Sequence, residues 1–126
     1  MAKRSKLQIA KSRTDKLCTP VAKTLHPNCE VCGQPTTVGH HWIEKSRSNN
    51  LRYNPDNLIG LCQSCHYKIH NRNGTMIMTS HDIVDDIIKV RGKDWKERMD
   101  IEGRKIIKAD LNWVEKAEQE LKSICG

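Results

Sequence analysis

The segment "GLCQSCHYKIH" spans Gly60 to His70 and holds two cysteines three residues apart, followed at once by two histidines four apart. A Cys-x-x-Cys pair, here Cys62 and Cys65, lets two thiolates converge on one tetrahedral zinc ion. If the segment runs into a helix at about 100° per residue, the cysteines centre on one direction and the histidines, His66 and His70, about 90° away. The two pairs cannot easily share one ion, which leaves the histidines to face a second site.

A second pair of cysteines lies upstream in "NCEVCGQ", where Cys29 and Cys32 are followed by Gly33. Glycine permits the tight turn that a metal-binding Cys-x-x-Cys segment needs. Two such segments about thirty residues apart predict one structural zinc site with four cysteine ligands. The alternative, a pair of redox dithiols, lacks the βαβ context that this motif normally keeps. Cys18 and Cys125 stand alone, and we interpret both as free thiols.

Composition also favours a metal-stabilised domain. The chain has 126 residues, no phenylalanine and 4% aromatic residues, so the aromatic part of its core is small and a metal is expected to help hold it together. No apolar run approaches membrane-spanning length, and the N-terminus lacks the apolar segment of a signal peptide. We therefore expect a reducing cytoplasm, where cysteines are read as metal ligands or thiols before disulfides.

The positive charge is concentrated near the N-terminus. The formal net charge is +7, and residues 1–28 hold seven lysines and arginines but one aspartate. A basic arm over residues 1–23 is suited to a polyanion such as a phosphate backbone. A solvated, disordered start is an equally good interpretation of the same composition.

Two adjacent histidines lie in "VGHHWIEKS". If this segment is a strand, His40 lies on the same face as Val38, and His41 lies on the opposite face. One histidine could then bind a metal while its neighbour stays available as a base. The following segment, "EKSRSNNLRYNPDNLIG", is a long polar loop of the kind that is usually functional in a small domain.

Together, "CEVCG", "HHW" and "YNPDNLIGLCQSCHYKIH" resemble the Cys-containing branch of the HNH endonucleases, over residues 29 to 70. The flanking segments "KSRTDKLCTPVAKTLHPNCEVCG", "LRYNPDNLIGLC" and "VRGKDWKERM" resemble small phage HNH proteins, including the NinG-type recombination nucleases. The resemblance implies a small α+β fold with a ββα-metal, treble-clef-like core over residues 24–75. It also implies a divalent cation held by two strands and a helix at the scissile phosphate.

The resemblance also implies roles for five residues. His40 and His66 fit the ligands of the catalytic cation, and His41 fits the general base that activates water. His70 fits an additional ligand or a phosphate contact. Asn57 fits the middle residue of the motif, which orients the base or binds the metal in different members.

The residue types suit this chemistry. Hydrolysis of a phosphodiester needs a base with a pKa near neutrality, and a cation to stabilise the transition state and the leaving oxygen. Histidine ligands with few carboxylates leave positions open for water and phosphate oxygens, so Mg²⁺, Mn²⁺, Ni²⁺ or Zn²⁺ could serve. Three loop cations could clamp DNA phosphates, although solvated side chains are at least as good an interpretation: Lys45, Arg47 and Arg52.

Residues 76–126 are expected to form a helical extension. Residues 79–92 read as a helix with Thr79 and Asp82 in capping-box-like spacing, and a short helix is expected around Trp95 and Met99. Residues 110–126 read as a third helix with Asp110 as its cap. We expect these helices to cover the zinc module; a dimer or partner surface on the last helix is the alternative. His26 and His81 are treated as incidental.

Two functions follow from these observations. The first is a metal-dependent DNA endonuclease, phage-encoded and of low sequence specificity, with branched or recombination DNA as a candidate substrate. It would act in the bacterial cytoplasm as a monomer or homodimer. The second is a non-catalytic zinc module that binds nucleic acid or protein. The first accounts for the histidines and Asn57 together, whereas the second needs only the cysteines, so we favour the nuclease.

Overall fold

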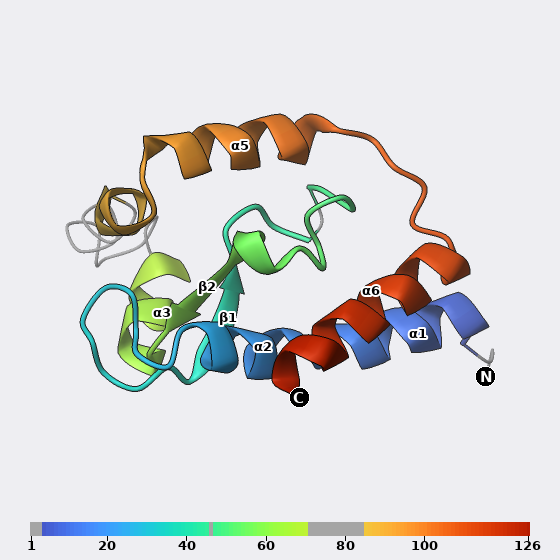
Figure 1. Cartoon of the computed structure of the whole chain (residues 1–126), viewed down its shortest axis with the longest axis horizontal. Helices are drawn as coiled ribbons and strands as arrows, with labels where there is room; N and C mark the ends of the chain where they lie inside the picture. The colour runs from blue at the N-terminus through green and yellow to red at the C-terminus, as the bar shows by residue number, and fades with distance from the viewer. Residues whose placement is uncertain (1–3, 46, 71–84) are drawn as a thin grey trace.

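The computed structural model describes residues 4–45, 47–70 and 85–126, except the side chains of Lys68 and His70. The fold is a small α+β arrangement with a two-stranded antiparallel sheet and helices on either side (Figure 1). Residues 85–91 are also helical. The other elements are α1 (Lys6–Asp15), α2 (Cys18–Leu25), β1 (Val38–His41), the 3₁₀ turn η1 (Pro55–Asn57), β2 (Leu58–Leu61), α3 (Gln63–His70), α5 (Lys93–Arg104) and α6 (Leu111–Cys125).

The two strands form the centre of the fold. β1 pairs with β2 so that Val38 lies opposite Leu61 and His41 opposite Leu58. Every residue of β2 is buried, because α2 and α3 both pack against the hairpin. The apolar run Leu58–Leu61 is therefore a strand covered by helices, as is usual for continuous apolar segments of this length.

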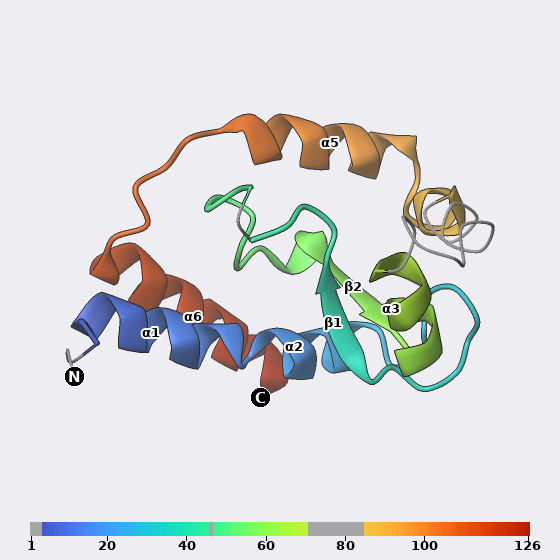
Figure 2. The ribbon, with the colours of Figure 1, turned by 180° about the vertical axis from the view of Figure 1, so that it is seen from behind.

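The basic N-terminal segment folds into two helices. Ser5 caps α1 through a capping box with Gln8. The helix α2 continues past residue 23, where the basic arm was expected to end. Figures 1 and 2 show α1 beside α6. Arg13 in α1 makes a two-pronged ion pair with the buried carboxylate of Glu118 in α6. This positively charged segment is thus part of the folded body.

The C-terminal helix was correctly predicted. Asp110 caps α6 by accepting a hydrogen bond from the backbone N–H of Trp113 at 2.9 Å. The apolar face of α6 is covered by α1 and α2 in one cluster of buried residues. The helices around Trp95 and over residues 85–91 are present too, whereas Thr79, His81 and Asp82 lie outside the described residues.

Gly39 is needed where β1 and α2 approach each other. A Cβ atom on Gly39 would lie 2.8 Å from the carbonyl oxygen of Cys18 and 2.9 Å from the Cβ of Ala22. Both are rigid parts of α2, so Gly39→Ala should lower the free energy of unfolding by about 2 kcal/mol in a urea titration. Gly103→Ala is the matched control, since its new Cβ would be 3.5 Å from Leu51 Cδ1, an ordinary contact. Equal destabilisation of both variants would contradict the requirement for glycine at position 39.

Candidate metal centre and active site

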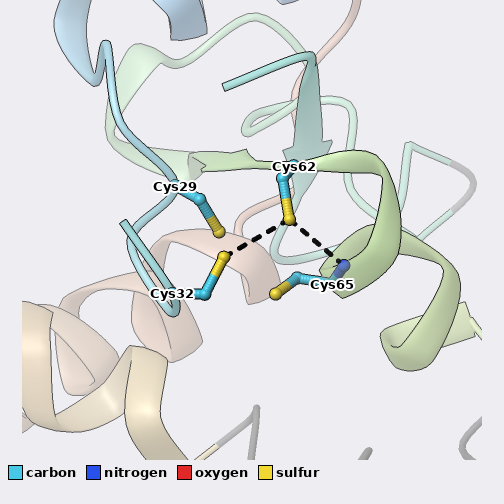
Figure 3. A group of neighbouring side chains, drawn as sticks. All are labelled: Cys29, Cys32, Cys62 and Cys65. Atoms are coloured by element: carbon cyan, nitrogen blue, oxygen red, sulfur yellow. Dashed lines mark hydrogen bonds between the residues drawn. The ribbon is translucent and has the colours of Figure 1, made fainter. Parts of the chain in front are cut away.

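Four cysteines converge at one end of the hairpin (Figure 3). Cys29 and Cys32 come from the loop after α2, Cys62 directly follows β2, and Cys65 lies in the first turn of α3. Their sulfur atoms all lie within 4.8 Å of one another. Zinc–sulfur bonds of about 2.3 Å in a tetrahedron place the sulfurs about 3.8 Å apart. The cluster therefore suggests a structural metal, and four cysteines are a donor set typical of zinc.

The electrostatics of the cluster also favour a cation. Burial acts to raise the pKa of Cys29, but backbone N–H groups of Cys32, Cys62 and Val31 outweigh it and lower this pKa to about 7. Burial, followed by hydrogen bonds with the neighbouring cysteines, raises the pKa of Cys65. Four thiolates cannot coexist in so small a volume without a positive charge between them, and a divalent metal supplies it.

The turn of the first cysteine pair has the predicted conformation. Gly33 has a φ of +81°, in the left-handed region, where glycine carries no steric penalty. Its N–H donates to the carbonyl of Cys29 at 3.0 Å. The turn thus directs both sulfurs to the same side.

Arg91 attaches this turn to the rest of the domain. Its guanidinium donates to both oxygens of Glu30, at 2.5 and 2.9 Å, and to the carbonyl of Leu58 at 2.8 Å. Glu30 also accepts a hydrogen bond from the N–H of Gly60 at 2.8 Å. The Arg91 guanidinium lies over the Trp95 ring, 5.1 Å from its centroid. One side chain thus links the first cysteine pair, β2 and α5.

His26, to which the sequence assigned no role, belongs to the same network. Its Nε2 accepts a hydrogen bond from Arg91 at 3.0 Å, so the ring is neutral in this arrangement. Burial lowers the pKa of His26, in agreement with a neutral ring. Its Nδ1 also lies 3.9 Å from Oε1 of Glu30, four residues along the chain.

Arg91→Met is expected to destabilise the domain by about 3 kcal/mol, because it leaves the buried carboxylate of Glu30 without its cation. The side chains of Arg91 and Glu30 are only 12% and 6% exposed. Thermal and urea unfolding of the zinc-loaded protein measure the effect. Arg98→Met is the control: Arg98 pairs with Asp56 at the surface, so its loss should change stability little. An Arg91→Met variant as stable as the control would contradict this role.

The strand β1 separates the two adjacent histidines, as alternation requires. His40 faces α3, where its ring lies 5.4 Å from that of His66, centroid to centroid, at an interplanar angle of 66°. His41 faces α2, with its Nε2 3.8 Å from the sulfur of Cys18. His40 and His66 are thus adjacent enough for one ring nitrogen of each to bind the same cation. His70 ends α3, and its side chain lies outside the described residues.

His41 is held by a main-chain carbonyl. Its Nε2 lies 2.8 Å from the carbonyl oxygen of Arg52. A carbonyl only accepts, so Nε2 carries the hydrogen, and Nδ1 of the neutral ring keeps a lone pair that can take up a proton. Burial lowers the pKa of His41, opposed by the hydrogen bond to Arg52. Burial also raises the pKa of Cys18 to about 11, so His41 has a neutral thiol beside it.

The loop that supplies this carbonyl is fixed at two points. The first is Arg52 itself, whose guanidinium makes two hydrogen bonds to Asp15 of α1, at 3.0 and 2.7 Å. The second is the buried side chain of Asn57, which accepts from the N–H of Ile43 at 2.8 Å and donates to the carbonyls of Ile43 and Leu51 at 3.0 and 3.3 Å. Both hold the main chain around His41 in position.

The three loop cations therefore differ. The side chain of Arg52 is 20% exposed and is paired with Asp15. Lys45 and Arg47 are exposed. Only these two present their charges openly to a ligand at the loop surface.

Residues 29–72 match the family model for HNH endonuclease. The matched segment contains the cysteine cluster, both strands and four histidines, His40, His41, His66 and His70. It supports placement in the HNH family and suggests nuclease activity. Comparison with curated proteins and with solved structures found no match. Within the described residues, no helix is both long and apolar enough to cross a membrane.

Some residues around the HNH segment had no signal in the sequence. The carbonyl of Arg52 is a main-chain group that any residue would carry, and Cys18 reaches His41 only because α2 packs on β1. Arg91 lies 61 positions beyond Glu30, so local patterns could not connect them. The cysteine and histidine spacings, with Asn57 in the segment that resembles the HNH motif, carried the information about the site.

Proposed function

We propose that the chain is a metal-dependent HNH endonuclease that hydrolyses phosphodiester bonds in DNA, with residues 24–75 as its ββα-metal core. The observation that carries the proposal is the pair of adjacent histidines on opposite faces of β1. His40 lies beside His66, and His41 is anchored at Nε2 by the Arg52 carbonyl. A module that only binds nucleic acid needs the cysteines alone, whereas the nuclease accounts for these histidines as well.

The chain's own residues would divide the reaction between them. His41 Nδ1 takes the proton of the attacking water, while the carbonyl of Arg52 keeps the ring oriented and stabilises the imidazolium that forms. Water adds to phosphorus and the bond to the 3′ oxygen breaks. A divalent cation bound to His40 and His66 would supply charge stabilisation to the phosphate and the departing oxygen. Asn57 positions the loop and does not touch the reacting atoms.

The donor set leaves the identity of the cation broad. Imidazole nitrogen suits Zn²⁺ and Ni²⁺, and the open positions suit water and phosphate oxygens, the ligands that Mg²⁺ and Mn²⁺ prefer. We propose His70 as a third ligand or a phosphate contact from its place at the end of α3. Lys45 and Arg47 are proposed as phosphate contacts from their exposure.

The substrate proposal follows from the size of the domain. One small domain offers few side chains to read base edges, so we propose low sequence specificity. Action on branched or recombination DNA, and a phage gene expressed in the bacterial cytoplasm, come from the resemblance to NinG-type proteins.

Cleavage of supercoiled plasmid tests the proposed function. Zinc-loaded protein is incubated with the plasmid without added divalent cation, and then with Mg²⁺, Mn²⁺, Ni²⁺ or Zn²⁺. Nicked or linear product that depends on added cation supports the endonuclease, and four-way junctions then test the preference for branched DNA. DNA that is bound but never cut, on plasmid and junction alike, would favour the non-catalytic zinc module.

A further inference from the structure

A groove of about 430 Å³ lies outside the proposed catalytic centre. One wall is the loop around Arg47 and Ser48, and the other is the end of α5 with the segment that follows it, including Arg104, Lys105 and Ile106. In Figure 1 this segment runs from α5 to the start of α6. The second wall lies beyond residues 29–72, so the HNH match says nothing about it.

The groove is positively charged. Arg47 and Arg104 are both exposed, and neither makes a side-chain ion pair within the part of the chain that the structure describes. Lys105 also lines it, with its Nζ 2.6 Å from Glu102 and its side chain 56% exposed. None of the described lining residues is acidic. A concave surface with charge of one sign focuses the electric field and attracts polyanions.

Hydrogen bonds connect the groove to the loop that anchors His41. Asn50 donates hydrogen bonds from Nδ2 to the carbonyl and to Oε2 of Glu102, both at 3.0 Å. This clamp joins the loop to the last turn of α5, so the two walls are held together. The same loop continues to Arg52, whose carbonyl binds His41. The groove and the anchor of His41 therefore belong to the same loop.

An apolar side chain completes the surface. Ile106 lines the groove and is 99% exposed. A protruding aliphatic side chain next to cations is suited to the apolar surface of deoxyribose and base edges in a minor groove. An acidic protein would use the cations but would gain less from this contact.

We propose that this groove binds the backbone of duplex DNA beside the cleavage site, with Arg47 and Arg104 contacting phosphates and Ile106 contacting the minor groove. The proposal rests on the proposed DNA endonuclease function and adds a second contact surface outside the HNH segment. α5 and the segment after it would thus hold substrate as well as cover the core.

The test measures binding separately from cleavage. Fluorescence anisotropy follows a labelled duplex with zinc-loaded protein, without added divalent cation, over a series of salt concentrations. Arg47→Gln/Arg104→Gln is expected to weaken binding and to reduce the slope of log K against log salt by about 2, about 1 per lost phosphate contact. Ile106→Asn should weaken binding without changing this slope, because no counterion release is lost.

Lys89→Gln/Lys93→Gln is the matched control, since it removes the same charge from exposed positions that do not line the groove. The proposal is overturned if the groove variant keeps the parent slope, if the control loses as much, or if the parent does not bind duplex DNA. Plasmid cleavage by the parent is scored independently. If the parent cleaves plasmid but the groove variant binds duplex DNA like the parent, the groove proposal alone is rejected. If the groove variant binds more weakly but the parent never cleaves, the groove proposal is supported and the nuclease is rejected.

Discussion

His41→Ala is expected to reduce DNA cleavage by a factor of about 100 to 10,000, the usual contribution of a general base. The variant removes the imidazole ring that the Arg52 carbonyl orients through Nε2. Because the carbonyl can bind water in place of the ring, the fold should survive the change. Initial rates of plasmid nicking at saturating cation concentration measure the effect.

Three controls make this result specific. Zinc content and far-ultraviolet circular dichroism should match the parent, which excludes loss of structure. His26→Gln removes a histidine that contacts Arg91, and it should lower stability without lowering the cleavage rate of the folded protein. DNA affinity should be unchanged in His41→Ala. A variant that still cuts at the parental rate would remove His41 as the base.

Cys62→Ser is expected to abolish the folded state at ordinary temperatures. Cys62 links β2 to α3, its side chain is buried, and its sulfur is 3.5 Å from that of Cys32. Structural zinc contributes about 10–16 kcal/mol in small zinc-binding peptides. This is comparable to the roughly 5–15 kcal/mol that holds a whole domain folded, so a domain with so small an aromatic core should not tolerate the loss. Bound zinc and unfolding are measured on the same samples.

Cys125→Ser is the matched control, because Cys125 is exposed and lies outside the four-cysteine cluster. It should bind one zinc ion per chain and unfold like the parent. Prolonged treatment of the parent with a strong chelator should reproduce the Cys62→Ser result. Parental stability in both the Cys62→Ser variant and the chelated protein would show that the cysteines do not hold a structural metal.

Much of the local structure was predictable because short-range geometry determines it. A Cys-x-x-Cys segment can direct two sulfurs to one point whatever surrounds it, and a strand places neighbouring side chains on opposite faces. The side chain of Asp110 caps α6 by accepting a hydrogen bond from the main-chain N–H of Trp113, three residues on. These features depend on spacing within a few residues, which the sequence displays directly.

The N-terminal segment shows where local reasoning stops. Its positive charge suggested an arm, yet α1 packs against α6 through small buried residues, Ala10 and Thr14. These residues give α1 little apolar periodicity. The helix that it packs against, α6, lies about a hundred positions further along the chain, as the ion pair between Arg13 and Glu118 illustrates. No local pattern could have revealed that pairing.

The sequence by itself determined the residue types of both sites and the spacing that brings four cysteines together and sets His40 and His41 on opposite faces. Only the tertiary structure decided which carbonyl orients His41, that Asp15 engages Arg52, and that Arg91 binds Glu30. The reason is physical: ligand spacing is a property of local backbone geometry, whereas the partner of a side chain depends on how distant segments pack.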